Sequence, residues 1–115
     1  MNNIVLKHAI VLLKKKAKEN NAPIWSAVAE LLSKPRRKRV SVNISRINRW
    51  SKDGDVIVVP GKVLGSGLIN HKITVGAFKF SEAAKRKIEK AGGRCVFIEN
   101  LAEEQPEGSK IKILG

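Results

Sequence analysis

Residues 56–67 read Val-Ile-Val-Val-Pro-Gly-Lys-Val-Leu-Gly-Ser-Gly. The first four are apolar and β-branched, and they are bounded by Asp-Gly-Asp before them and by Pro60-Gly61 after them. This pattern predicts a strand over 56–59 that is buried on both faces. The glycines that follow predict a glycine-rich turn over 61–67.

Downstream of this turn, the pattern predicts a strand, a helix and a second strand. A strand is expected from about 73 to 80, and Ser81 is a good N-cap for a helix that reaches Ala91, where Gly92-Gly93 end it. A further strand is expected over 94–98. Short connections in this order favour a right-handed parallel crossover. The remainder reads as an acidic tail over 99–107, broken by Pro106 and Gly108, and a small edge strand over 110–114.

Upstream of residue 56, the chain reads as mainly helical. Apolar residues at helical spacing predict an amphipathic helix over 3–19, and Pro23 suits the first turn of a second helix that ends by Lys34. Residues 40–42 read as a short strand. Asn43 or Ser45 would cap a short helix whose inward residues are Ile44, Ile47 and Trp50.

The positive charge of the chain lies mostly in its first half. The 115 residues carry a formal net charge of +13 and predict a single domain. Residues 1–52 hold 13 Lys and Arg against two Glu, whereas 53–115 hold 10 against eight acids. We therefore expect an α/β fold in which 1–52 form a basic, mainly helical RNA-facing part and 53–115 form the α/β core part.

Several functional classes are not expected from this composition. No apolar run approaches the ~20 residues that span a bilayer, so no membrane association is predicted. Cys95 is the only cysteine, and His8 and His71 are the only histidines, which leaves no set of metal ligands. The sequence offers no nucleophile together with a general base and a third group that would orient the base. We expect no enzyme activity, metal, cofactor or small-molecule substrate.

The candidate RNA-binding residues begin with the densest basic segment. Arg outnumbers Lys there, and the planar guanidinium binds phosphate through two points. A solvated loop or a localisation signal is the alternative for this segment. On the following helix, Arg46 and Arg49 share one face, and Lys52 extends it. This group comprises Lys34, Arg36, Arg37, Lys38, Arg39, Arg46, Arg49 and Lys52.

The glycine-rich segment supplies the second group of candidates. A nucleotide-binding P-loop is disfavoured, because Lys62 precedes the last glycines and a strand follows them. Two interpretations stay open: a tight turn between strands, or close backbone approach to an RNA phosphate with polar side chains nearby. The residues of the second interpretation are Gly61, Lys62, Gly65, Ser66, Gly67, Asn70, His71 and Lys72.

Aromatic residues are few, and they indicate how RNA would be held. There is no Tyr, and Trp25 and Trp50 lie at core spacings, so stacking platforms are not expected. RNA would be bound by its shape and backbone. His8 is predicted at the surface, and Cys95 is predicted to be a small buried hydrophobic residue.

Three motifs stand in fixed order along the chain. They are Lys34-Pro35-Arg36-Arg37, then Val59-Pro60-Gly61-Lys62-Val63-Leu64-Gly65-Ser66-Gly67, then Phe80-Ser81-Glu82-Ala83-Ala84 with Ile88 and Ala91-Gly92-Gly93. Together they resemble the archaeal and eukaryotic large-subunit ribosomal protein eighteen-e family, which is related to bacterial ribosomal protein fifteen. The resemblance covers nearly the whole chain, and the compact length resembles the archaeal form.

The resemblance implies a structural constituent of the large ribosomal subunit in the cytoplasm. It implies binding to large-subunit ribosomal RNA and contact with neighbouring ribosomal proteins. It also implies a fold in which N-terminal helices precede an irregular superhelix of strand-strand-helix turns. The alternative from a different class is a general nucleic-acid-binding architectural protein that uses the same basic surface.

Overall fold

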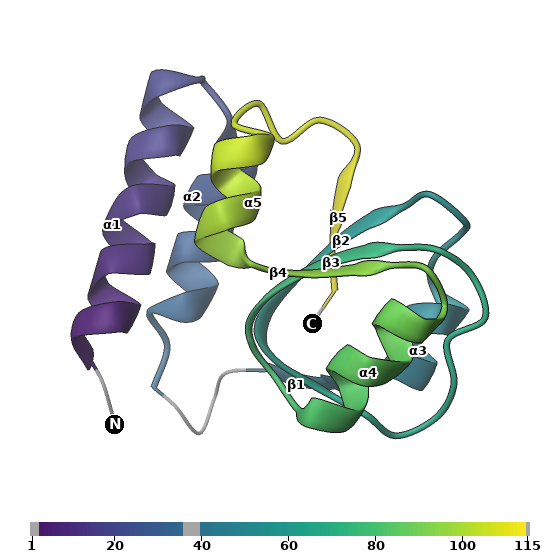
Figure 1. The fold of residues 1–115 in the computed structure, drawn as a ribbon. Helices are drawn as coiled ribbons and strands as arrows, with labels where there is room; N and C mark the ends of the chain where they lie inside the picture. The colour runs from purple at the N-terminus through teal and green to yellow at the C-terminus, as the bar shows by residue number, and fades with distance from the viewer. Residues whose placement is uncertain (1–2, 36–39, 115) are drawn as a thin grey trace.

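The computed structural model describes residues 3–35 and 40–114, and it confirms the predicted α/β class (Figure 1). The elements in chain order are α1 (Asn3–Glu19), α2 (Pro23–Leu32), β1 (Val40–Asn43), α3 (Ile44–Arg49), β2 (Val56–Leu64), β3 (Thr74–Phe80), α4 (Glu82–Lys90), β4 (Arg94–Phe97), α5 (Ile98–Glu104) and β5 (Ile111–Ile113).

One parallel sheet organises the described residues. Its strand order is β1-β2-β3-β4, and β5 also pairs with β2. β3 occupies one side of β2. β5 and β1 share the other side, since β5 pairs with 56–58 and β1 with 61–64. The predicted parallel pairing of the strands on either side of α4 is confirmed, as is the predicted C-terminal edge strand.

Strand β2 is longer than the sequence pattern predicts. It continues through Pro60 and Gly61 to Leu64, so the predicted turn over 61–67 is wrong in its first half. The register against β3 shifts between Val59 and Lys62, which marks a bulge. Proline lacks the N–H that a strand ladder needs, and a bulge is one of the places where a strand accommodates it. The chain therefore bends at Pro60 without leaving the sheet.

Two helical layers cover the two faces of the sheet (Figure 1). On one face, α3 and α4 pack through Ile44, Ile47, Ala84 and Ile88 against alternate strand residues that include Ile57. On the other face, α1, α2 and α5 pack around the intervening strand residues, whose side chains point the opposite way. The buried residues of this second cluster are Leu13, Ala22, Trp25, Val28, Ala29, Leu32, Val58, Ile98, Leu101 and Ala102. Both parts of the chain thus contribute to the core.

The predicted acidic tail is wrong, because residues 98–104 form helix α5. Ile98, Leu101 and Ala102 lie at i, i+3 and i+4, and all three are fully buried. Leu101 packs over Gly76 of β3, where a Cβ atom would lie 2.7 Å from the Leu101 Cδ2 atom. The acidic side chains at 103 and 104 face outward. The segment after α5 is held by Trp25, whose indole N–H donates to the Gln105 and Pro106 carbonyls at 3.2 and 3.0 Å.

The predicted N-cap of α4 is confirmed, whereas the predicted inward position of Trp50 is wrong. The Ser81 hydroxyl accepts a hydrogen bond from the Ala84 N–H at 3.1 Å. The Trp50 side chain is 60% exposed. Helix α3 ends at Arg49, and Trp50 has non-helical backbone angles at its C-cap, so the inward stripe of Ile44 and Ile47 does not extend to it.

Candidate nucleic-acid interface

Helix α3 and the loop over 65–72 form one continuous surface. The Ser45 N–H donates to the Ser66 carbonyl at 3.2 Å, and the Ser66 N–H donates to the Asn43 Oδ1 atom at 3.2 Å. Farther along, the Asn70 N–H donates to the Asn48 Oδ1 atom at 3.2 Å. These bonds join residues more than 20 positions apart, so the α3 members of the first predicted group lie beside the loop members of the second.

The basic residues that were predicted on and just after α3 lie at the surface. Arg46, Arg49 and Lys52 are all exposed. Lys72 is also exposed, and its backbone is fixed by Asp53, whose carboxylate accepts from the Lys72 N–H at 2.8 Å. The Gly54 N–H donates to the Lys72 carbonyl at 2.7 Å. Four cations are therefore presented from a backbone that is held by hydrogen bonds.

His71 is bonded within the protein at both ring nitrogens. Its Nε2 atom lies 2.7 Å from the Ser51 Oγ atom, and its Nδ1 atom lies 3.0 Å from the Asn70 Oδ1 atom. The buried Ser51 hydroxyl in turn donates to the Ile47 carbonyl at 2.6 Å. The ring therefore connects the loop to the end of α3, and this contact gives His71 a structural role that the sequence did not reveal.

The glycines of the candidate site make room for protein atoms. Gly61 is buried in β2, and a Cβ atom there would collide with the Val40 carbonyl oxygen of β1. The Gly61 backbone therefore lies against β1 within the protein, and its contact with RNA stays a prediction. At Gly65, a Cβ atom would lie 2.6 Å from the Ala83 Cβ atom of α4. Gly67 has φ +98° and packs against Ser45. These residues allow the loop to lie close against α3 and α4.

Lys87 of α4 holds this loop from the other side. Its Nζ atom donates to the Gly65 carbonyl at 2.8 Å and to the Gly67 carbonyl at 3.1 Å. The side chain is half-buried. Lys87 is thus a basic residue whose charge is used inside the protein.

Two other basic residues of α4 were missed by the sequence analysis. Arg86 and Lys90 are exposed, and they line an open hollow of about 440 Å³ together with Leu68 and Ile69 of the loop. The signal was present as the run Lys85-Arg86-Lys87, but it lies in the half of the chain whose total charge is nearly balanced. We call the combined set the α3–α4 surface; its members are Arg46, Arg49, Lys52, Lys72, Arg86 and Lys90.

The other predicted candidates lie apart from this surface or outside the described residues. Lys34 is exposed just beyond α2, and Lys62 is exposed on β2. Arg36, Arg37, Lys38 and Arg39 fall outside the described residues. His8 is exposed on α1, as predicted. Cys95 is only half-buried, so its predicted burial is partial, but burial still raises the pKa of its thiol to about 11.

Two acidic residues outside the α3–α4 surface are paired with cations. Asp55 accepts from Lys112 Nζ at 2.9 Å and from the Lys52 N–H at 2.8 Å, and these bonds lower the pKa of its carboxyl group. Glu104 forms a two-point ion pair with Arg94 at 3.1 and 2.9 Å, which lowers the pKa of the Glu104 carboxyl. Both pairs are solvent-accessible, so each adds little to stability.

Metal sites and membrane spans are both absent from the part of the chain that the structure describes. Within residues 3–35 and 40–114, no three His, Cys, Asp or Glu side chains come together as a metal site. Among the same residues, no helix is both long enough and apolar enough to cross a membrane.

Comparison with known proteins identifies the family. The family model described as "Ribosomal protein 60S L18 and 50S L18e" matches residues 1–115. A relative from Methanococcus maripaludis named "Large ribosomal subunit protein eL18" is 52% identical over 102 residues, 89% of this chain and 85% of that protein. A protein of the same name from Methanospirillum hungatei is 45% identical over 98% of this chain and 93% of its own length. Another from Methanopyrus kandleri is 47% identical over 97% of this chain and 92% of its own length. The resemblance seen in the three sequence motifs is confirmed: the chain belongs to the family of ribosomal proteins 60S L18 and 50S L18e.

Proposed function

We propose that this large-subunit ribosomal protein binds ribosomal RNA through phosphate contacts on the α3–α4 surface. One observation carries the proposal: Arg46 and Arg49 are exposed on a helix whose neighbouring loop is fixed to it by one backbone–backbone hydrogen bond and by two bonds from loop N–H groups to asparagine side chains. The loop adds Lys72, and α4 adds Arg86 and Lys90. A group of cations carried on a fixed backbone matches a folded polyanion whose phosphates have fixed positions.

Each cation that neutralises a phosphate releases condensed counterions, and this release drives binding. Arginine adds geometry to the charge, because its planar fork can hold one phosphate through two hydrogen bonds. The proposed mechanism is therefore recognition of RNA shape through its backbone. Any neighbouring ribosomal proteins would contact other faces, and the proposed place of action is the ribosome in the cytoplasm.

The test is the salt dependence of binding to a large-subunit ribosomal RNA transcript, measured by filter binding or fluorescence anisotropy. The log–log salt slope of the double variant Arg46→Gln/Arg49→Gln should be smaller by about 0.7 to 0.9 for each phosphate that is no longer neutralised. Lys110→Gln is the matched control, because Lys110 is exposed next to β5 and lies outside the α3–α4 surface. Equal slopes in the double variant and the parent protein would refute the proposed surface.

The alternative, a general nucleic-acid-binding architectural protein, uses the same cations. It predicts that an excess of unrelated duplex DNA competes as well as the ribosomal RNA transcript does. The proposed function predicts that the transcript competes far better, because only it presents the matching arrangement of phosphates. Competition in one assay at one salt concentration separates the two.

A further inference from the structure

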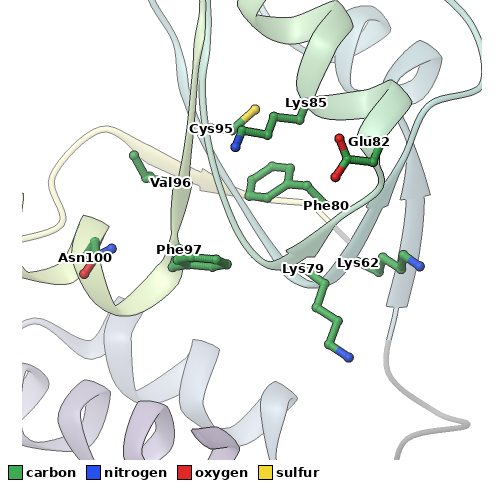
Figure 2. A pocket seen from close by; sticks show the side chains of 9 residues that line it. All are labelled: Lys62, Lys79, Phe80, Glu82, Lys85, Cys95, Val96, Phe97 and Asn100. Carbon is green, nitrogen blue, oxygen red and sulfur yellow. The ribbon is translucent and has the colours of Figure 1, made fainter.

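A second hollow lies on a different part of the protein, at the carboxyl ends of β2, β3 and β4 (Figure 2). Its volume is about 540 Å³, within the range of roughly 300 to 1,000 Å³ that is typical of ligand sites. Figure 2 shows Phe80 in the middle of the view, with lysine side chains above and below it. The lining residues are Lys62, Lys79, Phe80, Glu82, Lys85, Cys95, Val96, Phe97 and Asn100.

The topology of the sheet explains why a hollow forms there. β3 leads into α4, which packs on one face of the sheet, whereas β4 leads into α5, which packs on the opposite face. The two connections separate at the carboxyl ends of neighbouring parallel strands and leave a crevice between them. In open α/β sheets, this switch point is where ligands bind.

The lining combines aromatic rings with positive charge. Phe97 is 53% exposed, and Phe80 lies beside the hollow as a second ring. Three lysines border the hollow against one carboxylate, that of Glu82. Among the described residues, neither Lys62 nor Lys85 forms a salt bridge. The hollow therefore offers ring faces for stacking and ammonium groups for phosphate.

We infer that this hollow binds one unpaired nucleotide of RNA, with its base stacked on Phe97 and its flanking phosphates near Lys62, Lys79 and Lys85. The inference rests on the proposed RNA binding and adds a second, chemically different contact. Glu82 can accept hydrogen bonds from base N–H groups, and the Asn100 amide can both donate and accept. An acidic peptide would satisfy the lysines and leave the ring faces unused, so the lining favours a nucleotide.

The test measures binding of the full chain to penta-adenylate at low salt by fluorescence anisotropy. Phe97→Leu keeps an apolar side chain but removes the ring, and it should weaken binding about 5- to 150-fold, the usual range for loss of one base–aromatic stacking contact. Phe97→Trp restores a ring face and should restore binding. Trp50→Leu is the matched control, because it removes a similarly exposed aromatic side chain at the C-cap of α3, away from the hollow. Thermal unfolding of each variant verifies that it is folded.

Each contrary outcome has a defined meaning. If Phe97→Leu binds penta-adenylate like the parent, or if Trp50→Leu alone weakens binding, the inference is wrong. Equal binding of free AMP would indicate a small-molecule site, and stronger binding of deca-glutamate would indicate a protein partner; either result overturns the assignment to RNA. If penta-adenylate does not bind but the ribosomal RNA transcript does, this inference fails and the proposed function stands. If the transcript does not bind either, the proposed function has failed as well.

Discussion

Two adjacent basic residues of α4 are predicted to have separate roles, one in stability and one in RNA binding. Lys87 donates to two loop carbonyls at 2.8 and 3.1 Å, whereas Arg86 is exposed on the α3–α4 surface. Replacing each by Met removes one positive charge and leaves the apolar part of the side chain. The Lys87 variant loses two hydrogen bonds within the protein, whereas the Arg86 variant loses a charge at the surface.

The expected decrease in stability follows from the two hydrogen bonds of Lys87. The shorter bond is partly buried and is worth about 1.5 kcal/mol, the lower end for a charged donor. The longer bond is exposed and adds about 0.5 kcal/mol at most. Lys87→Met should therefore cost about 2 kcal/mol, which lowers Tm by roughly 8 °C for a chain of this size. Arg86→Met should change stability by less than about 0.5 kcal/mol.

The assay pairs thermal or urea unfolding with the salt slope of RNA binding. Arg86→Met should reduce the slope by about 0.7 to 0.9 and leave Tm unchanged, whereas Lys87→Met should lower Tm with little change of slope in the folded protein. Equal decreases in stability in the two variants would refute the reasoning. So would a slope that falls only in Lys87→Met, since its ammonium is assigned to the loop.

Three further predictions test local features of the fold. The thiol pKa of Cys95 is about 11, against an ordinary value of 9.0, so the reactive thiolate is about 100-fold scarcer at pH 8 in the folded protein. Because the nucleophilicity of a thiolate rises with its pKa, alkylation by iodoacetamide should be about 10-fold slower in the folded than in the urea-unfolded protein. Ser81→Ala should lower the free energy of unfolding in urea by about 1 kcal/mol, because it removes the N-cap of α4. Ser81→Asn should keep most of that stability, because asparagine is also a good N-cap residue. The pKa of the Asp55 carboxyl is lowered, so its stabilising effect is present above pH 3.8 and lost as the pH falls through the lower folded value. Because its ion pair is solvent-accessible, the Tm of Asp55→Asn should lie only slightly below that of the parent at pH 7, and the difference should disappear on acidification below 3.8.

The elements that the sequence predicted well carry local signals. Val56 to Val59 is an uninterrupted β-branched run, and Ser81 stands before a helical pattern that ends at Gly92. Both signals act within one element, so no knowledge of distant contacts is needed. The two N-terminal helices were predictable for the same reason, since their apolar stripes keep a helical period.

The elements that the sequence missed depend on distant contacts or on misleading composition. Pro60-Gly61 has the composition of a turn, but β1 pairs with this segment and keeps it in the sheet as a bulge. The glutamates of α5 concealed its apolar stripe of Ile98, Leu101 and Ala102, which becomes informative only when α1 and α2 are there to cover it. Trp50 follows the period of α3, yet that helix ends one residue earlier.

The basic surface was only partly predictable, because the net charge of a sequence segment does not show on which face of the sheet each charge lies. Arg86 and Lys90 belong to a half of nearly balanced charge, since the acidic residues at 99, 103 and 104 offset them in the sum. Those acids lie on α5, on the opposite face of the sheet from α4. These three acids are therefore separated from Arg86 and Lys90 by the sheet, whereas Glu82 and Glu89 lie on α4 itself.

Helix α4 stands between the two proposed RNA contacts and fixes their spacing. Glu82 and Lys85, three residues apart, line the hollow at the carboxyl ends of the strands, whereas Arg86 and Lys90, four residues apart, face the loop at 65–72. Ser81 caps the helix, and Ala84 and Ile88 anchor it in the core. An RNA that reaches both contacts must therefore match a distance that is set by one helix. Each cation alone can contact any phosphate, but the fixed spacing of the two contacts allows the protein to select a folded RNA by its shape.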